Sequence, residues 1–125
     1  MITHSLGINY VSPSGSASAS LTGSGNSSLE LVETISASAV NQQVNPVSIP
    51  VSGLQCFVLL ASANMVVYTN SPSTGSPAQT FTLYANQPFY WFSGNGSNPI
   101  TTAITQLYVT SALGGTLSVR ALANI

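Results

Sequence analysis

Apolar side chains recur at every second position in one short segment of this chain after another. The first residues show the pattern most clearly, because Ile2, His4, Leu6, Ile8 and Tyr10 alternate with Thr, Ser, Gly and Asn. Successive side chains of a β-strand point to opposite faces, so this alternation predicts a strand with one buried face. The pattern favours pleated strands over helices.

Further segments of this kind follow, and Gly, Pro, Asn or Ser residues separate most of them. The charged helix formers are nearly missing, since the chain has no Lys and two Glu. We therefore predict an all-β fold: a jelly-roll-like β-sandwich of about eight to ten short antiparallel strands. The predicted strands are residues 2–10, 17–21, 29–35, 47–51, 57–61, 65–69, 80–84, 88–92, 107–111 and 117–122.

Three segments need separate interpretation. Residues 57–61 are apolar on both faces, which suits a central strand covered on each side. Residues 100–106 are the best candidate for a short helical turn. The chain is expected to form a single domain over residues 1–125. Residues 11–28, rich in Ser, Gly and Ala, form either a flexible arm or an edge strand of that domain. Their alternation favours the edge strand.

Only three of the 125 side chains carry a full charge at neutral pH, namely Glu30, Glu33 and Arg120. Phosphate binding needs several cations, so one Arg argues against nucleic acid as a partner. The same shortage argues against an anionic membrane surface, and no stretch reaches the roughly 18 apolar residues of a spanning helix. The first residues lack the features of a signal peptide, so we expect synthesis in a cytoplasm, with retention there or export by a route other than a cleaved signal.

The few reactive side chains do not predict a catalytic site. Glu30 and Glu33 are an odd number of residues apart in a strand, so they point to opposite faces and cannot form an acid/base pair. A nucleophilic thiol at Cys56 would need a nearby imidazole, which only His4 could supply. Cys56 and His4 are more simply interpreted as buried or interface residues. A metal site needs three or four clustered ligands, which these few side chains do not supply. We expect no enzyme activity, no metal and no cofactor.

The candidate interface residues are the charged side chains and part of the aromatic run at residues 89–92. Arg120 alternates out from its apolar neighbours, so it faces either a partner or an internal carboxylate, Glu30 or Glu33. One aromatic pair belongs in the core. The other is a second buried face, an interface patch or a platform for stacking carbohydrate. The candidate set is Glu30, Glu33, Arg120, Tyr90 and Trp91.

From about residue 54 to residue 122, the chain resembles small proteins encoded in the head regions of tailed bacteriophages. The similarity lies in strand and turn residues. They are residues 67–71 (VYTNS), 80–83 (TFTL), Gln-Pro at 87–88 before Trp91, Asn-Pro at 98–99, 107–110 (LYVT), and the segment from Gly-Gly at 114–115 to 119–122 (VRAL).

The resemblance implies a capsid decoration, or cement, protein of the virion. Such proteins are β-rich, bind the outside of the head in many copies and bridge major capsid subunits. The resemblance implies no catalytic residues. The alternatives are a phage tail or virion module that binds carbohydrate or a receptor through Trp91 and Tyr90, and a small hydrolase built on Cys56 or His4. Because so few charges keep copies apart, we also expect self-association as a dimer or trimer.

Overall fold

The computed structural model describes residues 1–44 and 47–125, and within these residues it contains ten strands and no helix. The all-β prediction is therefore confirmed. The strands are β1 (Ile2–Ser12), β2 (Gly15–Gly25), β3 (Ser27–Ile35), β4 (Ala39–Val44), β5 (Leu54–Ala61), β6 (Met65–Thr69), β7 (Thr80–Leu83), β8 (Phe89–Phe92), β9 (Leu107–Ser111) and β10 (Gly115–Ala123).

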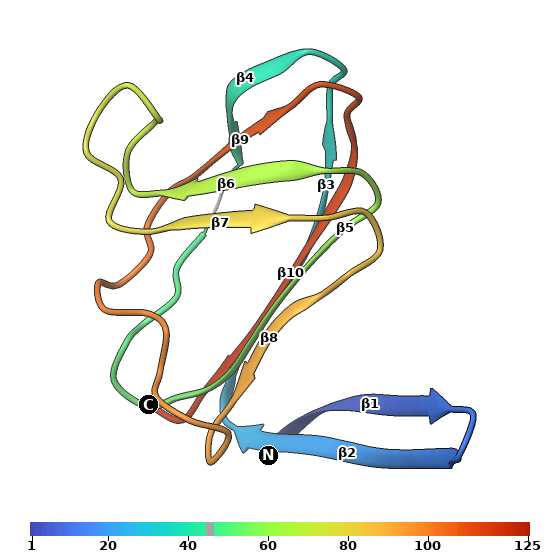
Figure 1. The fold of residues 1–125 in the computed structure, drawn as a ribbon. Coiled ribbons are helices and arrows are strands. Elements are labelled where there is room, and N and C mark those ends of the chain that lie inside the picture. The colour runs from blue at the N-terminus through green and yellow to red at the C-terminus, as the bar shows by residue number, and fades with distance from the viewer. Residues whose placement is uncertain (45–46) are drawn as a thin grey trace.

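Eight of these strands form the two sheets of a β-sandwich (Figure 1). One sheet has the order β3-β10-β5-β8 and the other has the order β4-β9-β6-β7. All pairs in the two sheets are antiparallel, and four of them are nested along the chain: β3 pairs with β10, β4 with β9, β5 with β8 and β6 with β7. The first and last strands of the sandwich, β3 and β10, are therefore neighbours in one sheet.

The core lies between the two sheets, where alternate residues of each strand are buried. Phe57 of β5 contacts Phe81 and Phe89, with ring centroids 5.7 and 6.1 Å away, and these tilted and edge-to-face contacts are typical of aromatic packing. The other large contributors are Ile35, Leu59, Leu117 and Val119 from one sheet, and Val44, Met65, Val67, Leu107 and Val109 from the other.

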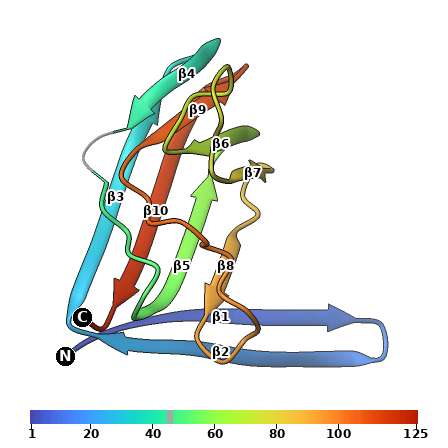
Figure 2. The ribbon, with the colours of Figure 1, turned by 90° about the vertical axis from the view of Figure 1, so that its left-hand side faces the viewer.

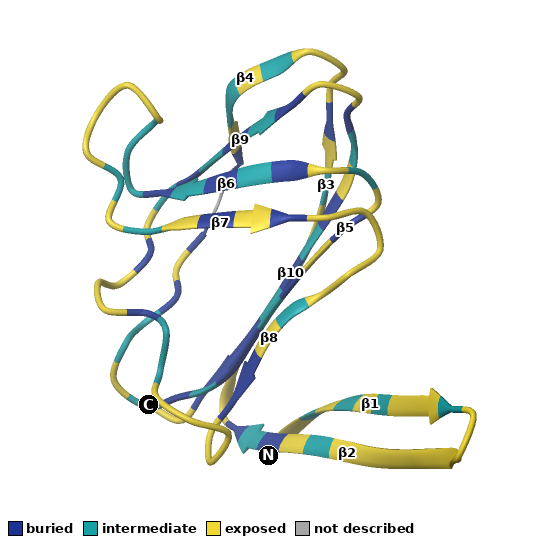
Figure 3. Cartoon of the chain, in the orientation of Figure 1, coloured by how far each residue is buried: buried dark blue, intermediate teal, exposed yellow. Residues whose placement is uncertain are grey.

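The remaining strands, β1 and β2, form a two-stranded ribbon, residues 2–25, that leaves the sandwich (Figure 2). Their pairing is continuous from Ile2 opposite Gly25 to Ser12 opposite Gly15. The base of the ribbon packs on the sandwich, and the remainder extends past it with its residues exposed (Figure 3). The Ser-rich part of residues 11–28 is thus a strand whose partner is β1.

The predicted helical turn at residues 100–106 is wrong. The Asn70 side chain holds this segment in an extended path: its Oδ1 accepts hydrogen bonds from the Thr105 and Gln106 N–H groups at 2.8 and 3.4 Å. Its Nδ2 donates to the Ala103 carbonyl at 2.9 Å. These long-range bonds satisfy backbone groups that a helix would pair locally.

Two strand predictions also differ from the structure. Among the described residues, the pairing of residues 47–51 is limited to an isolated bridge from Ile49 to Ile104, so this segment is a loop rather than a strand. The strand β4 was not predicted. Asn41 has a φ of 52°, and the pairing of β4 with β9 shifts between Ala39 and Gln42, which breaks the alternation that would have revealed it.

Candidate functional site

The base of the ribbon packs against the outer face of the sheet β3-β10-β5-β8. A small cluster of Cys56, Phe92 and Leu122 is buried there, and Leu6 and Leu21 of the ribbon pack against it. Residues of β5 are therefore covered on both faces near its start, as the apolar sequence indicated. The cover does not reach the far end of that strand, where the Leu60 side chain is 39% exposed.

Close approach of the ribbon depends on a glycine, Gly25, at the end of β2. A Cβ at Gly25 would lie 2.8 Å from the Ala123 carbonyl carbon, which real Cβ atoms essentially never do. At Gly23 it would touch Cys56 and Phe92 at ordinary distances of 3.6 Å. The backbone of β2 at Gly25 therefore approaches the sheet more closely than a side chain would allow.

His4 ties β1 to two strands of that sheet. Its Nε2 atom lies 3.0 Å from the Ser28 Oγ atom, and its Nδ1 atom lies 3.7 Å from the Cys56 Sγ atom. The imidazole ring therefore connects β3 and β5 on the outer face of the sheet. The sequence predicts that His4 lies on the apolar face of its strand, and in the structure that face makes this contact.

The structure brings together the two residues of the hydrolase hypothesis, His4 and Cys56, but in a state unsuited to nucleophilic attack. Burial raises the pKa of the Cys56 thiol to about 11 from its ordinary 9.0, against a smaller lowering by a backbone hydrogen bond at Leu122. The thiol stays protonated at neutral pH, within 3.7 Å of the Nδ1 atom of His4. A protonated, buried thiol is an anchor rather than a nucleophile.

A groove of about 420 Å³ lies between β1 and the uncovered part of the same sheet. Residues 3–6 of β1 form one wall, Val58 and Leu60 contribute an apolar floor, and Glu30 and Arg120 contribute opposite charges. Two of the three charged side chains of the chain therefore meet in one cavity, together with His4.

Arg120 and Glu30 lie directly opposite each other in the antiparallel pair of β10 and β3. Neither side chain makes an ion pair or a hydrogen bond within the part of the chain that the structure describes. Glu33 stands opposite Leu117 and shares the inner face with Leu31, which agrees with the opposite faces predicted for the two carboxylates. The internal partner available to Arg120 is therefore Glu30.

The aromatic run divides between the two faces of β8. Phe89 and Trp91 point inward, and the Trp91 side chain is 8% exposed while its Nε1–H donates to the Gly96 carbonyl at 3.1 Å. Phe92 points outward into the cluster under the ribbon, and Tyr90 is 36% exposed. Of the two aromatic candidates, only Tyr90 offers a ring to a partner at the surface.

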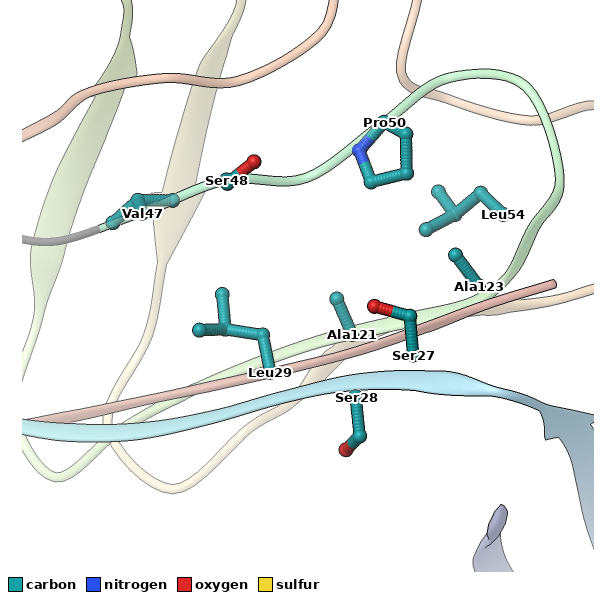
Figure 4. Close-up of a pocket in the computed structure, with 9 residues that line it drawn as sticks. All are labelled: Ser27, Ser28, Leu29, Val47, Ser48, Pro50, Leu54, Ala121 and Ala123. Carbon is teal, nitrogen blue, oxygen red and sulfur yellow. The ribbon is translucent and has the colours of Figure 1, made fainter. Parts of the chain in front are cut away.

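A second cavity, of about 330 Å³, opens at the edge of β3 on the inner side (Figure 4). Leu29 and Ala121 point into it from the strands, and the loop that carries Ser48 and Pro50 crosses above them. Ser28 points away from these side chains, toward the face where His4 binds it. The cavity contains hydroxyls and apolar groups without a charged side chain, so it has no acid, base or metal ligand to offer.

Within the described residues, the structure contains neither a candidate metal centre nor a helix that could span a membrane. Across residues 1–44 and 47–125 there is no group of three or more His, Cys, Asp or Glu residues that could hold a metal ion. Likewise, none of the described segments forms a helix that is long and apolar enough to cross a membrane. The sandwich, ribbon and groove define a charge-poor all-β protein with one protruding arm. No family model, curated protein or solved structure matches this chain.

Sequence reasoning missed the docking of the ribbon on the sheet. The signals were the apolar outer face of β5, at Cys56 and Val58, and the glycines at the end of β2. Ser28, the partner of His4, had no distinguishing signal among so many serines.

Proposed function

We propose that this chain is a non-enzymatic capsid decoration, or cement, protein. It binds the outer surface of a bacteriophage head after synthesis in the host cytoplasm, and it stabilises the head by bridging major capsid subunits. The ribbon is the observation that carries this proposal. Its two strands of 11 residues contain no Asp, Glu, Lys or Arg and project beyond the body that supports their base. A two-stranded hairpin on its own is marginally stable in water, so an arm of this length is suited to a second surface.

The neutral surface supports the same function. A decoration protein meets its partner at a fixed contact distance, where hydroxyl groups, amides and strand edges can pair without long-range attraction. Copies that are attached to one particle also hold one another at high effective concentration, so each contact needs only modest affinity. A formal net charge of −1 leaves little repulsion between such copies.

The nested strand pairing supports a jelly-roll topology, in which a long antiparallel hairpin folds into two sheets. Here the first strand of the sandwich pairs with the last, and this nesting continues inward to β6 and β7. Viral capsid domains are among the proteins that use this architecture. Lectins and enzymes use it too, so the topology agrees with the proposal and the ribbon carries it.

The alternative module, which binds carbohydrate or a receptor, is not favoured by the position of its key residue. Trp91 is buried and hydrogen-bonded, so it cannot supply the exposed plane on which a sugar ring stacks. Tyr90 alone remains, without an exposed aromatic partner in the same strand. We therefore propose one function.

The proposal is tested by adding the purified chain to heads that lack it, assembled from the major capsid protein encoded beside its gene. We expect saturable co-sedimentation with the heads and a higher temperature of head disruption when the chain is bound. Heads of an unrelated phage serve as the control. Absence of binding, or binding that leaves the disruption temperature unchanged, would contradict the proposed function.

A further inference from the structure

The apolar face of the ribbon continues beyond the body that covers its base. Leu6 and Leu21 face each other in the register of β1 and β2 and pack on the sheet. Ile8 and Tyr10 follow on the same face of β1, with Ala17 opposite Tyr10. The Tyr10 side chain is 69% exposed. One face of the ribbon is thus half covered by this chain and half uncovered.

The free edge of β1 borders the groove. Among the described residues β1 pairs only with β2, so its other edge presents unpaired backbone groups along its length. Residues 3–6 of this edge form a wall of the groove, and the floor beside them contains Val58 and the partly exposed Leu60. An exposed strand edge next to an apolar floor is suited to the addition of another strand.

We propose that the strand added here is β1 of a second copy of this chain. The two β1 strands pair antiparallel about a two-fold axis at Gly7, which joins the two ribbons into one four-stranded sheet. The distal half of each ribbon then lies over the groove of the other copy. This is an isologous interface, in which each copy gives and receives the same arm.

The register follows from the alternation of β1. With the axis at Gly7, Tyr10 of one copy stands opposite His4 of the other, and Ile8 stands opposite Leu6. Even-numbered residues therefore meet even-numbered residues, and both apolar faces point to the side where both bodies lie. A register shifted by one residue would place an apolar side chain opposite a polar one across the axis.

A second copy fits this site because the ribbon of this chain already makes the same kind of contact with its own sheet. The base of its own ribbon packs on the outer face of the sheet through Leu6 and Leu21, and the groove continues that face toward Leu60. The arriving arm brings Ile8 and Tyr10, and its strands contain no Asp, Glu, Lys or Arg that the apolar floor would have to desolvate. The inference rests on the proposed function only for its setting, where a dimer would span two shell subunits.

Sedimentation velocity of the purified chain, across the micromolar range, tests the dimer without any capsid. We expect a reversible monomer–dimer equilibrium, with the dissociation constant raised about tenfold or more by Tyr10→Glu, which buries a charge in the contact. Val11→Glu is the matched control, since Val11 is 71% exposed on the opposite face of the same strand. A monomer at every concentration, a trimer, or equal weakening by both variants would overturn the proposal.

A thiol at the axis tests the register. Directly opposed residues of an antiparallel pair have Cα atoms about 4.5–5.5 Å apart, a distance that a disulfide spans. A Cβ at Gly7 meets nothing within 4 Å, so Gly7→Cys fits the fold. We expect mild oxidation to link Gly7→Cys into covalent dimers far more completely than Ser14→Cys at the ribbon tip. Equal linking of the two variants would overturn the register, and capsid binding by a strictly monomeric chain would leave the proposed function intact.

Discussion

The Nδ1 atom of His4 lies 3.7 Å from the Sγ atom of Cys56, although 52 positions separate the two residues in the chain. This contact joins the first strand of the ribbon to a central strand of the sandwich. Imidazole and thiol are a catalytic pair in some enzymes, but this thiol is buried and protonated. The pair therefore fixes the base of the arm.

The Cys56 thiol should be unreactive in the native protein. Because its pKa is raised to about 11, the rate of alkylation should remain low at pH 8 and rise only near that pKa. The exposed thiol introduced by Ser14→Cys should be alkylated over the pH range expected of an ordinary cysteine, and this variant serves as the control. Native Cys56 that reacts as fast as this control would contradict the buried, protonated state.

The same shift links pH to stability. The pKa of Cys56 is higher in the folded chain than its ordinary value of 9.0, so the folded state holds the proton more tightly. Its contribution to stability is complete below pH 9 and is lost as the pH rises toward 11. Urea unfolding should show a steeper loss over this range for the natural chain than for Cys56→Ala.

Trp91 should behave as a core residue. Trp91→Ala should lower the free energy of unfolding by about 3–5 kcal/mol, because it removes a large buried ring and leaves a cavity. Tyr90→Ala, on the neighbouring and more exposed position, should cost about 1 kcal/mol. Since Trp91 is the sole Trp of the chain, its emission reports the site directly. Fluorescence emission typical of a water-exposed Trp, with quenching by iodide, would contradict the burial of Trp91.

Glu30 and Arg120 should couple weakly. Opposite charges that face each other across two strands contribute about 0.2–1 kcal/mol, and salt reduces the contribution at the surface. A double-mutant cycle with Glu30→Gln and Arg120→Gln should give a value in this range. The cycle of Arg120→Gln with Glu33→Gln is the control and should be additive, because Glu33 lies on the other face. Equal coupling to both carboxylates would contradict the register of β3 and β10.

The glycine at the ribbon base should resist substitution. Gly25→Ala would force a Cβ against the Ala123 backbone, so we expect the free energy of unfolding to fall by about 1–3 kcal/mol. Gly7→Ala meets open space and should change it by about 0.5 kcal/mol or less, measured below the concentrations at which copies associate. Comparable losses in both variants would contradict the docked position of the ribbon.

The strands of this fold could be predicted because alternation is a local property. Ile2 to Tyr10, and Leu29 to Ile35, each show which residues share a face before any partner is known. The choice of partner is not local. Nothing near residue 4 shows that His4 meets Ser28 and Cys56, which belong to different strands.

The errors arose where side chains override local pattern. Asn70 holds the segment before β9 extended from 35 positions away, and Asn41 turns the backbone of β4 at a positive φ. In the candidate site, the opposite faces of Glu30 and Glu33 followed from their spacing. The nearness of Glu30 to Arg120 did not, because it depends on the register between β3 and β10.

We propose that neutral contacts hold this protein on a phage head, and a salt wash tests this most directly. Heads carrying the chain should be washed through a series of salt concentrations, and the copies retained per head should be counted. At about 1 M salt the Debye length is about 3 Å, so attraction between exposed charges is largely screened. We predict the same number of retained copies at low and high salt. Release at moderate ionic strength would contradict the account.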